Sequence, residues 1–188
     1  DMRHFEPRFD GESAMFALLN RGKTSMVLDL KDAKARERLV PLIKRADVLV
    51  EQFRPGVMDR LGLGYEAVRQ INPAVVYCSI SGFGAEGPWS RVGAYDITIQ
   101  ALSGLMSITR DAGEDSEPCR WGVPVGDIAG SLYGVIGVLA AIEERTRTGL
   151  GQHVEIALSY GVHVIRPTTN QRRRTNADEP TQNGRSSR

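Results

Sequence analysis

Short apolar runs alternate with segments of helical spacing along the first half of the chain. The runs at residues 25–30, 47–51 and 74–80 are rich in Val, Leu and Ile, which is typical of buried strands. Apolar side chains three and four positions apart predict helices at residues 32–45 and 65–71. Short strands that alternate with amphipathic helices favour parallel pairing. We therefore expect an α/β fold with a doubly wound parallel sheet, whose ligands bind beyond the carboxyl ends of the strands.

The longest apolar segment lies in the second half of the chain and predicts a helix over residues 128–145. Gly149 follows it, and glycine is the usual residue just past a helix C-terminus. Residues 95–107 predict another helix, interrupted near Gly104, and alternation over residues 152–158 predicts one more strand. The long helix has an apolar face broad enough to be largely buried. The members of this face are Ile128, Leu132, Val135, Ile136, Val138, Leu139 and Ile142.

Asp127 lies where a loop meets this long helix, directly after Gly126. The local pattern favours an N-cap, because Asp is among the commonest N-cap residues and a cap stabilises its helix by ~1 kcal/mol. A carboxylate at this point would also be kept ionised by the exposed backbone N–H groups of the helix. The glycines on either side would leave its oxygens open to another molecule. The two interpretations, a cap and a reactive group, do not exclude each other.

The net charge of +1 favours neither a nucleic-acid nor a membrane partner. The charge is uneven, however, because the residues after Gly161 carry six arginines against Asp178 and Glu179. This end is polar and lacks periodicity, so we expect a folded domain at residues 1–160 and a disordered basic tail at residues 161–188. A nucleic-acid-binding arm is the alternative, but no aromatic residues are interleaved with the arginines, which favours a solvated tail.

The two cysteines, Cys78 and Cys119, lack metal-ligand spacing, so we expect reduced thiols and no metal site. Cys78 lies in a strand-like run and is interpreted as part of the core. The N-terminal residues show no apolar segment of the kind that signal peptides carry. No run reaches the ~18 apolar residues that a membrane span needs. A cytoplasmic protein without a membrane partner is therefore expected.

Six segments of the chain carry a specific pattern when they are taken in order. They lie at residues 20–31, 46–56, 71–73, 79–84, 125–130 and 148–155. Together they resemble the class III CoA-transferases of the CaiB/BaiF type, a family that includes formyl-CoA transferase and α-methylacyl-CoA racemase. Members of this family have a Rossmann-like large domain and a smaller domain, and two subunits interlock. The resemblance implies a homodimer and a Rossmann-like sheet that is incomplete here, because this chain lacks segments at both ends of the family's pattern.

The resemblance also implies an activity, the transfer of CoA from an acyl-CoA thioester to a carboxylic acid. In the family, the aspartate that matches Asp127 attacks the thioester carbonyl, and an aspartyl anhydride and then an aspartyl-CoA thioester follow. A carboxylate nucleophile suits this reaction because its acyl intermediates are activated enough to pass CoA onward. The helix terminus would keep Asp127 ionised and could supply N–H donors to the developing oxyanions.

Contacts to CoA, the expected substrate, follow from the same resemblance. Arg60 matches an arginine that binds the phosphates, and Lys31 and Arg54 are chemically apt because CoA carries several negative charges. Without the resemblance, each would more often be a solvated surface cation. The implied set is Leu28, Asp29, Leu30 and Lys31 along the adenosine, Gln52, Phe53, Arg54 and Arg60 in the next loop, and Gly93, Ala94, Tyr95 and Asp96 along the cofactor and substrate.

Tyr95 separates two branches of the family. Racemases carry a histidine at the matching place, and an imidazole exchanges protons near neutral pH whereas a phenol titrates near ~10. A transferase is therefore favoured, and an acyl-CoA racemase is the alternative. A further alternative, from another class, is an inactive CoA-binding or interaction module, because the chain lacks segments that the family's enzymes have.

Overall fold

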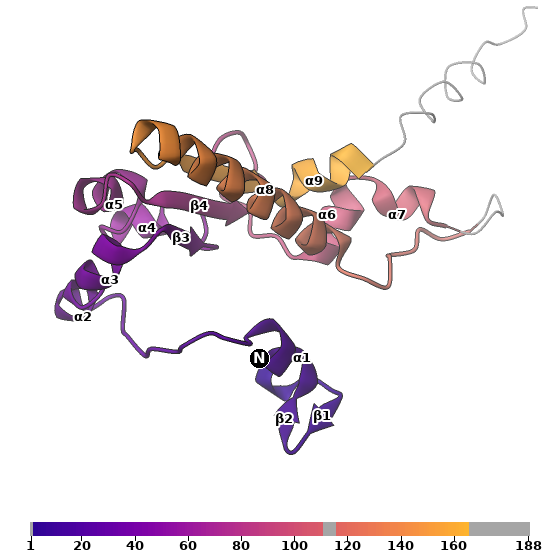
Figure 1. Ribbon diagram of the computed structural model, residues 1–188. Helices are drawn as coiled ribbons and strands as arrows, with labels where there is room; N and C mark the ends of the chain where they lie inside the picture. The colour runs from indigo at the N-terminus through magenta and orange to yellow at the C-terminus, as the bar shows by residue number, and fades with distance from the viewer. Residues whose placement is uncertain (1, 111–115, 166–188) are drawn as a thin grey trace, which may run out of the picture. The chain divides into compact units, whose positions relative to one another are not determined.

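The computed structural model describes residues 2–110 and 116–165, and its chain forms two compact units (Figure 1). The first unit ends at Arg38 and the second begins at Leu39. The first unit holds a 3₁₀ turn, a two-stranded antiparallel sheet and two short helices. These elements are η1 (Met2–His4), β1 (Arg8–Phe9), β2 (Glu12–Ser13), α1 (Ala14–Leu19) and α2 (Ala33–Glu37). Most of the expected basic tail, residues 166–188, lies outside the described residues.

Residues 25–30, which were expected to be the first strand of the sheet, form no strand. Met26 is 52% exposed and Val27 is 95% exposed. A strand is held by hydrogen bonds to a neighbouring strand, and this segment pairs with none among the described residues. The prediction was wrong because an apolar run makes a segment able to pair but does not provide its partner.

The second unit is built on a three-stranded parallel sheet. Its strands are β3 (Val48–Glu51), β4 (Val76–Ser81) and β5 (His153–Ala157), in the spatial order β3-β4-β5. The parallel register of both pairs confirms the three other predicted strands and the α/β class. The strands run side by side, so their carboxyl ends, at Glu51, Ser81 and Ala157, lie at one edge of the sheet.

The second unit also contains seven helices within the described part of the chain. They are α3 (Val40–Arg45), α4 (Val57–Arg60), α5 (Tyr65–Ile71), α6 (Asp96–Leu102), α7 (Leu105–Ile108), α8 (Val125–Thr148) and α9 (Leu158–Ile165). The segment at residues 32–45 was expected to form one helix, but it forms α2 and α3. Pro41 lies at the start of α3, and proline cannot donate the backbone hydrogen bond that would continue a preceding helix. The predicted interruption near Gly104 is confirmed, because Gly104 has a φ of 77° between α6 and α7.

The long helix α8 packs through small residues, not through the broad apolar face that the sequence suggested. Its buried positions are Val125, Gly126, Ala129, Gly130, Gly134 and Ala141. A Cβ on Gly130 would lie 2.3 Å from Cδ2 of Leu158, and one on Gly137 would lie 2.7 Å from Cγ1 of Val154. The helix therefore approaches β5 and α9 so closely that a side chain at either point would force Leu158 or Val154 to shift.

Most large apolar side chains of α8 lie on its other side and are exposed, while Val138 and Ile142 are half-buried. Leu132 is 60% exposed and Ile136 is 61% exposed, and Ile128, Val135 and Leu139 also lie in the open. The expectation that this face is buried was therefore wrong. By length and composition alone, α8 is also long and apolar enough to cross a membrane, which is weak evidence for a span. Its packing on β4 and β5 accounts for one side of the helix in the second unit.

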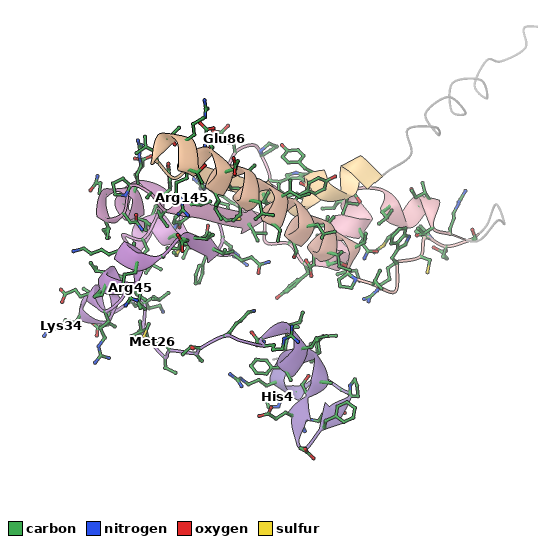
Figure 2. All side chains as sticks on the ribbon, viewed as in Figure 1. His4, Met26, Lys34, Arg45, Glu86 and Arg145 are labelled. Carbon is green, nitrogen blue, oxygen red and sulfur yellow. The ribbon has the colours of Figure 1, made fainter. Side chains whose placement is uncertain are left out.

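Arg145 fixes the C-terminal part of α8 to the sheet (Figure 2). Its guanidinium donates to the backbone oxygens of Asp47, at 3.3 Å, and Ala74, at 3.2 Å. It also donates to the carboxylate of Asp47 at 3.0 Å. The two acceptors precede β3 and β4, so one side chain ties the helix to the beginning of both strands.

The opposite end of α8 is held by a hydrophobic core in which α6, α7, α8 and α9 meet. Its buried members are Ile99, Leu105, Val125, Leu158 and Val162. Figure 1 shows α6 and α9 close to the N-terminal end of α8, where the loop after α7 enters the helix. This packing sets the position of the first turn of α8, and that turn contains Asp127.

Candidate active site

Asp127 is the third residue of α8 and is exposed. The helix begins at Val125, and Pro124 occupies the N-cap position without a side-chain hydrogen bond. The N-cap interpretation of Asp127 was therefore wrong, because the helix starts three residues earlier than the apolar pattern indicated. Among the described residues, no donor forms a hydrogen bond or ion pair with the Asp127 carboxylate. That carboxylate is free to meet another molecule.

Asp96, at the start of α6, supplies the missing cap from another helix. The backbone N–H of Gly126 donates to Oδ1 of Asp96 at 2.7 Å, and the N–H of Asp127 points to the same oxygen at 3.4 Å. A Cβ on Gly126 would lie 3.0 Å from this oxygen. Gly126 was expected to leave the approach to Asp127 open. It is instead buried, and its missing side chain makes room for Asp96.

The first four N–H groups of α8 all have acceptors in the structure. Those of Gly126 and Asp127 donate to Asp96, the N–H of Val125 donates to Val123 O at 2.9 Å, and that of Ile128 donates to Pro124 O at 3.0 Å. The expectation that this helix terminus supplies N–H donors to a developing oxyanion is thus contradicted, because these donors are already used.

Gln100 holds Asp96 in place from one turn further along α6. Its Nε2 donates to Oδ2 of Asp96 at 2.7 Å and to Val123 O at 3.2 Å. Its Oε1 accepts from the N–H of Trp121 at 2.9 Å. Gln100 has no exposed surface, and a buried amide is stable only when its polar atoms are bonded in this way. Asp96, Gln100 and the loop before α8 form one network.

The pKa of Asp127 is raised above its ordinary value, first by partial burial and then by the negative charge of Asp96. Both causes oppose ionisation. The sequence suggested the opposite direction, since the field of a helix N-terminus favours the ionised form. Part of that field is offset here by the Asp96 carboxylate, which lies closest to the N–H groups. Ionisable groups with a shifted pKa are a frequent feature of active sites.

A hollow of about 260 Å³ opens beyond the carboxyl ends of β3 and β4. It brings together five of the residues implied as CoA contacts. These are Gln52, Arg54, Gly93, Ala94 and Tyr95. Such an edge of a parallel sheet is the usual place for ligands.

Arg54 reaches into this hollow against the backbone of Gly93. A Cβ on Gly93 would lie 3.0 Å from Nη2 of Arg54, so the missing side chain gives the guanidinium its place. Among the described residues, Arg54 forms no ion pair. An unpaired guanidinium beside a hollow can bind a phosphate or a carboxylate through two parallel hydrogen bonds.

Leu158 connects the hollow to α8. Its side chain lines the hollow and also packs on Gly130. Asp127 precedes Gly130 by three residues, and residues three apart lie on neighbouring positions of one helix side. In addition, Tyr95 lines the hollow and is followed directly by Asp96, which binds the first turn of α8. Two neighbouring residues, Tyr95 and Asp96, therefore connect the lining of the hollow with the first turn of α8.

The remaining implied contacts of the second unit, Phe53, Arg60 and Asp96, are not among the residues that line this hollow. Phe53 lines a second hollow of about 110 Å³ together with Tyr65, Tyr77 and His153. Arg60 is exposed on α4. The segment from Leu28 to Lys31 belongs to the first unit, where the N–H of Lys31 donates to the Asp29 carboxylate at 2.9 Å. Their role as CoA contacts stays a prediction.

Two features of the site were missed by sequence reasoning. Gln100 was not considered, although its spacing of four residues from Asp96 within a helix indicates a contact. The second hollow was also missed, and in it Ser79 Oγ and His153 Nε2 lie 2.8 Å apart. The interpretation of Cys78 as a core residue is confirmed, because the side chain is buried and burial, followed by Glu51, raises the pKa of its thiol. In the described ranges, no group of three or more His, Cys, Asp and Glu side chains is arranged to hold a metal.

Comparisons with known proteins point to one family. Residues 1–188 match the family described as CoA-transferase family III. The chain is 42% identical over 162 residues to the acetyl-CoA:oxalate CoA-transferase of Acetobacter aceti, which covers 86% of this chain and 41% of that protein. It is 40% identical over 165 residues to the succinate–glutarate CoA-transferase of Agrobacterium fabrum, covering 84% and 41%.

A crystal structure of a CaiB/BaiF family protein from Brucella suis superposes with a TM-score of 0.79 at 38% identity, covering 87% of this chain and 44% of that one. The chain thus spans about two fifths of the length of these relatives. It belongs to CoA-transferase family III, and the resemblance drawn from the sequence is confirmed.

Proposed function

We propose that this chain carries the nucleophile of an enzyme that moves CoA from an acyl-CoA thioester to a carboxylic acid. The observation that supports the proposal most is the Asp127 carboxylate. It is exposed and has no bonding partner among the described residues. Its N–H donates to Asp96, which directly follows Tyr95, and Tyr95 lines a hollow with four other residues implied to bind CoA. The relatives from Acetobacter aceti and Agrobacterium fabrum are CoA-transferases that use oxalate or glutarate, by their names, which indicates small carboxylic acids as acceptors.

In the proposed reaction, an oxygen of Asp127 attacks the thioester carbonyl carbon. The C–S bond breaks, CoA leaves as a thiolate, and an acyl-aspartyl anhydride forms. The thiolate then attacks the aspartyl carbonyl, which releases the acyl group as a carboxylate and leaves an aspartyl-CoA thioester. The acceptor carboxylate attacks this thioester and displaces the thiolate. The thiolate finally attacks the acceptor carbonyl of the second anhydride, which releases the new acyl-CoA and restores Asp127.

Each part of the site has a task in this reaction. Asp127 must be ionised to attack, and a carboxylate whose pKa is raised is a stronger nucleophile once it is ionised. Arg54 would pair with a phosphate of CoA or with the carboxylate of the acceptor acid. The oxyanion donors must come from groups other than the first-turn N–H groups of α8, which are bonded to Asp96, Val123 and Pro124.

The test is to incubate the protein with acyl-CoA and hydroxylamine and to search for a hydroxamate at Asp127 by peptide mass spectrometry. We expect an adduct on Asp127 in the native protein and none in Asp127→Asn. Glu143→Gln is the matched control, since it removes a carboxylate from the exposed far end of the same helix. No adduct in native protein that is shown to be folded would contradict the proposal.

The same samples separate the alternatives. An inactive CoA-binding module would bind CoA in a titration equally well before and after Asp127→Asn, without an adduct in either protein. A racemase would exchange the hydrogen next to the thioester with solvent deuterium and would transfer no CoA to an added acid. The homodimer and the cytoplasmic location implied by the sequence remain proposals, which gel filtration and cell fractionation test.

A further inference from the structure

The network of Asp96 and Gln100 caps the first turn of α8 and also fixes the backbone of that turn. The acceptor for the first turn of α8 comes from another helix, thirty residues earlier in the chain, and not from the N-cap residue Pro124. Both oxygens of Asp96 are occupied by protein donors, Oδ1 by the backbone of α8 and Oδ2 by Gln100. A carboxylate whose two oxygens both accept from protein groups is better placed to hold those groups in position than to bind a substrate.

We propose that Asp96 is a positioning residue for Asp127 in CoA transfer, and that Gln100 selects a carboxylate at position 96. This inference rests on the proposed function. Asp96 Oδ1 binds the N–H of Gly126 and of Asp127 itself, so it fixes the backbone from which the nucleophile projects. Displacing a reacting group by ~1 Å can lower a rate by about 10²-fold.

The hydrogen-bond directions within the network are unambiguous. The N–H of Trp121 can only donate, so it must face Oε1 of Gln100, and the carbonyl of Val123 can only accept, so it must face Nε2. Gln100 is therefore forced to present N–H groups toward Asp96. Position 96 must in turn offer two acceptor oxygens, one to Gln100 and one to the N–H of Gly126.

A carboxylate meets this requirement and an amide does not. Asparagine at position 96 can accept from Gly126 through its oxygen, but its NH₂ group then faces the NH₂ group of Gln100. A buried donor that faces another donor loses its hydrogen bond and keeps its desolvation cost. Since Gln100 has no exposed surface, water cannot relieve the conflict. Gln100→Glu creates the opposite conflict, because an acceptor oxygen of the new carboxylate then faces the acceptor oxygens of Asp96 and Val123.

In the double variant Asp96→Asn with Gln100→Glu, most donors of the network again face acceptors. The amide of the new residue at 96 donates to the carboxylate at 100, which still accepts from the N–H of Trp121, and only Val123 lacks its donor. Pairwise coupling in such networks is measured by a double-mutant cycle. The single variants and the double variant therefore test the proposal together.

We expect Asp96→Asn to lower kcat by about 10²-fold while the KM for acyl-CoA changes by less than about threefold, as for a group that acts on transition-state geometry. Gln100→Glu is expected to show the same split. The double variant is expected to regain at least about tenfold in kcat over either single variant. Glu143→Gln and Gln70→Glu are the matched controls, because both positions are exposed and outside the network.

A second readout does not depend on activity. Amide hydrogen exchange of the peptide at residues 120–128 is expected to be faster in each single variant and slower again in the double variant. If the native protein forms no Asp127 adduct, the proposed function fails, and this exchange pattern still shows whether Asp96 and Gln100 hold the first turn.

Two results would overturn the inference. One is Asp96→Asn with native kcat and native exchange. The other is a double variant no better than the worse single variant in both measurements, since the selection of a carboxylate by Gln100 would then be absent.

Discussion

The two sides of α8 show opposite relations between side-chain size and burial. One side presents Gly126, Ala129, Gly130 and Gly134 and is buried against β5, α6 and α9. The other presents Leu, Ile and Val side chains and is largely exposed, as at Leu132. Hydrophobic strength therefore does not decide which side of this helix packs.

The difference has a geometric cause. The small side lets the backbone of α8 come within contact distance of Leu158 and Val154, and a larger residue would hold the helix away from the sheet. Close approach also brings the first turn of α8 within reach of Asp96, so the same glycines that pack the helix place Asp127. Asp127 itself is exposed, although it lies one turn before Gly130 on the same side of the helix.

The largest effect is expected on the packed side. Gly130→Leu places a side chain where a Cβ alone would lie 2.3 Å from Leu158, so it should lower the free energy of unfolding by at least about 2 kcal/mol. Ser131→Leu, at the next and exposed position, is the control and should change it by less than about 0.5 kcal/mol. Urea denaturation followed by circular dichroism measures both. Equal losses in the two variants would contradict the assignment of a packed side.

A smaller effect is expected at Asp127. Its raised pKa means that the folded state binds a proton more tightly than the unfolded state does. Its contribution to stability is therefore present at acid pH and is lost as pH rises through the folded-state pKa. Asp127→Asn should raise Tm near pH 7 and leave it unchanged below about pH 3.9, the usual pKa of Asp.

Thermal melts at several pH values check this, with Glu143→Gln as the reference for removal of a charge. A Tm gain for Asp127→Asn that is the same at all pH values would argue against a raised pKa in the folded protein. A lower Tm for Asp127→Asn near neutral pH would indicate that the pKa of Asp127 is lowered in the folded protein and not raised.

The smallest effect is expected on the open side. Leu132→Gln and Leu139→Gln should each change the free energy of unfolding by less than about 0.5 kcal/mol, because neither side chain loses much contact. Both should reduce the binding of a hydrophobic dye. A loss of about 2 kcal/mol that depends on protein concentration would show that another chain covers this side, as the implied homodimer would.

Most of the fold could be predicted from local pattern, and the failures share one cause. The strands at residues 47–51, 74–80 and 152–158 are found where expected, because each run carries the apolar side chains of a buried strand. Residues 25–30 have the same character and form no strand, since pairing needs a second segment that local sequence does not describe. The broad apolar face of α8 was wrongly predicted to be buried for the same reason, because local sequence does not show which other segment would cover it.

The candidate site also has some features that the sequence predicted and others that depend on contacts between distant segments. Asp127 was identified from its place after Gly126 and from the family pattern, and the hollow gathers five of the residues implied as CoA contacts. The role of Asp96 could not be foreseen, because its carboxylate meets a backbone thirty residues away. The raised pKa of Asp127 also depends in part on the nearby charge of Asp96.

The sequence by itself determined the α/β class and the family, and it led to Asp127 as the proposed nucleophile, because these depend on periodicity and on motifs that are local in the chain. Only the tertiary structure decided which side of α8 is buried, what caps its first turn and in which direction the pKa of Asp127 moves. Those properties depend on which atoms meet across space, and the distance between two groups is fixed by packing and not by their order in the chain.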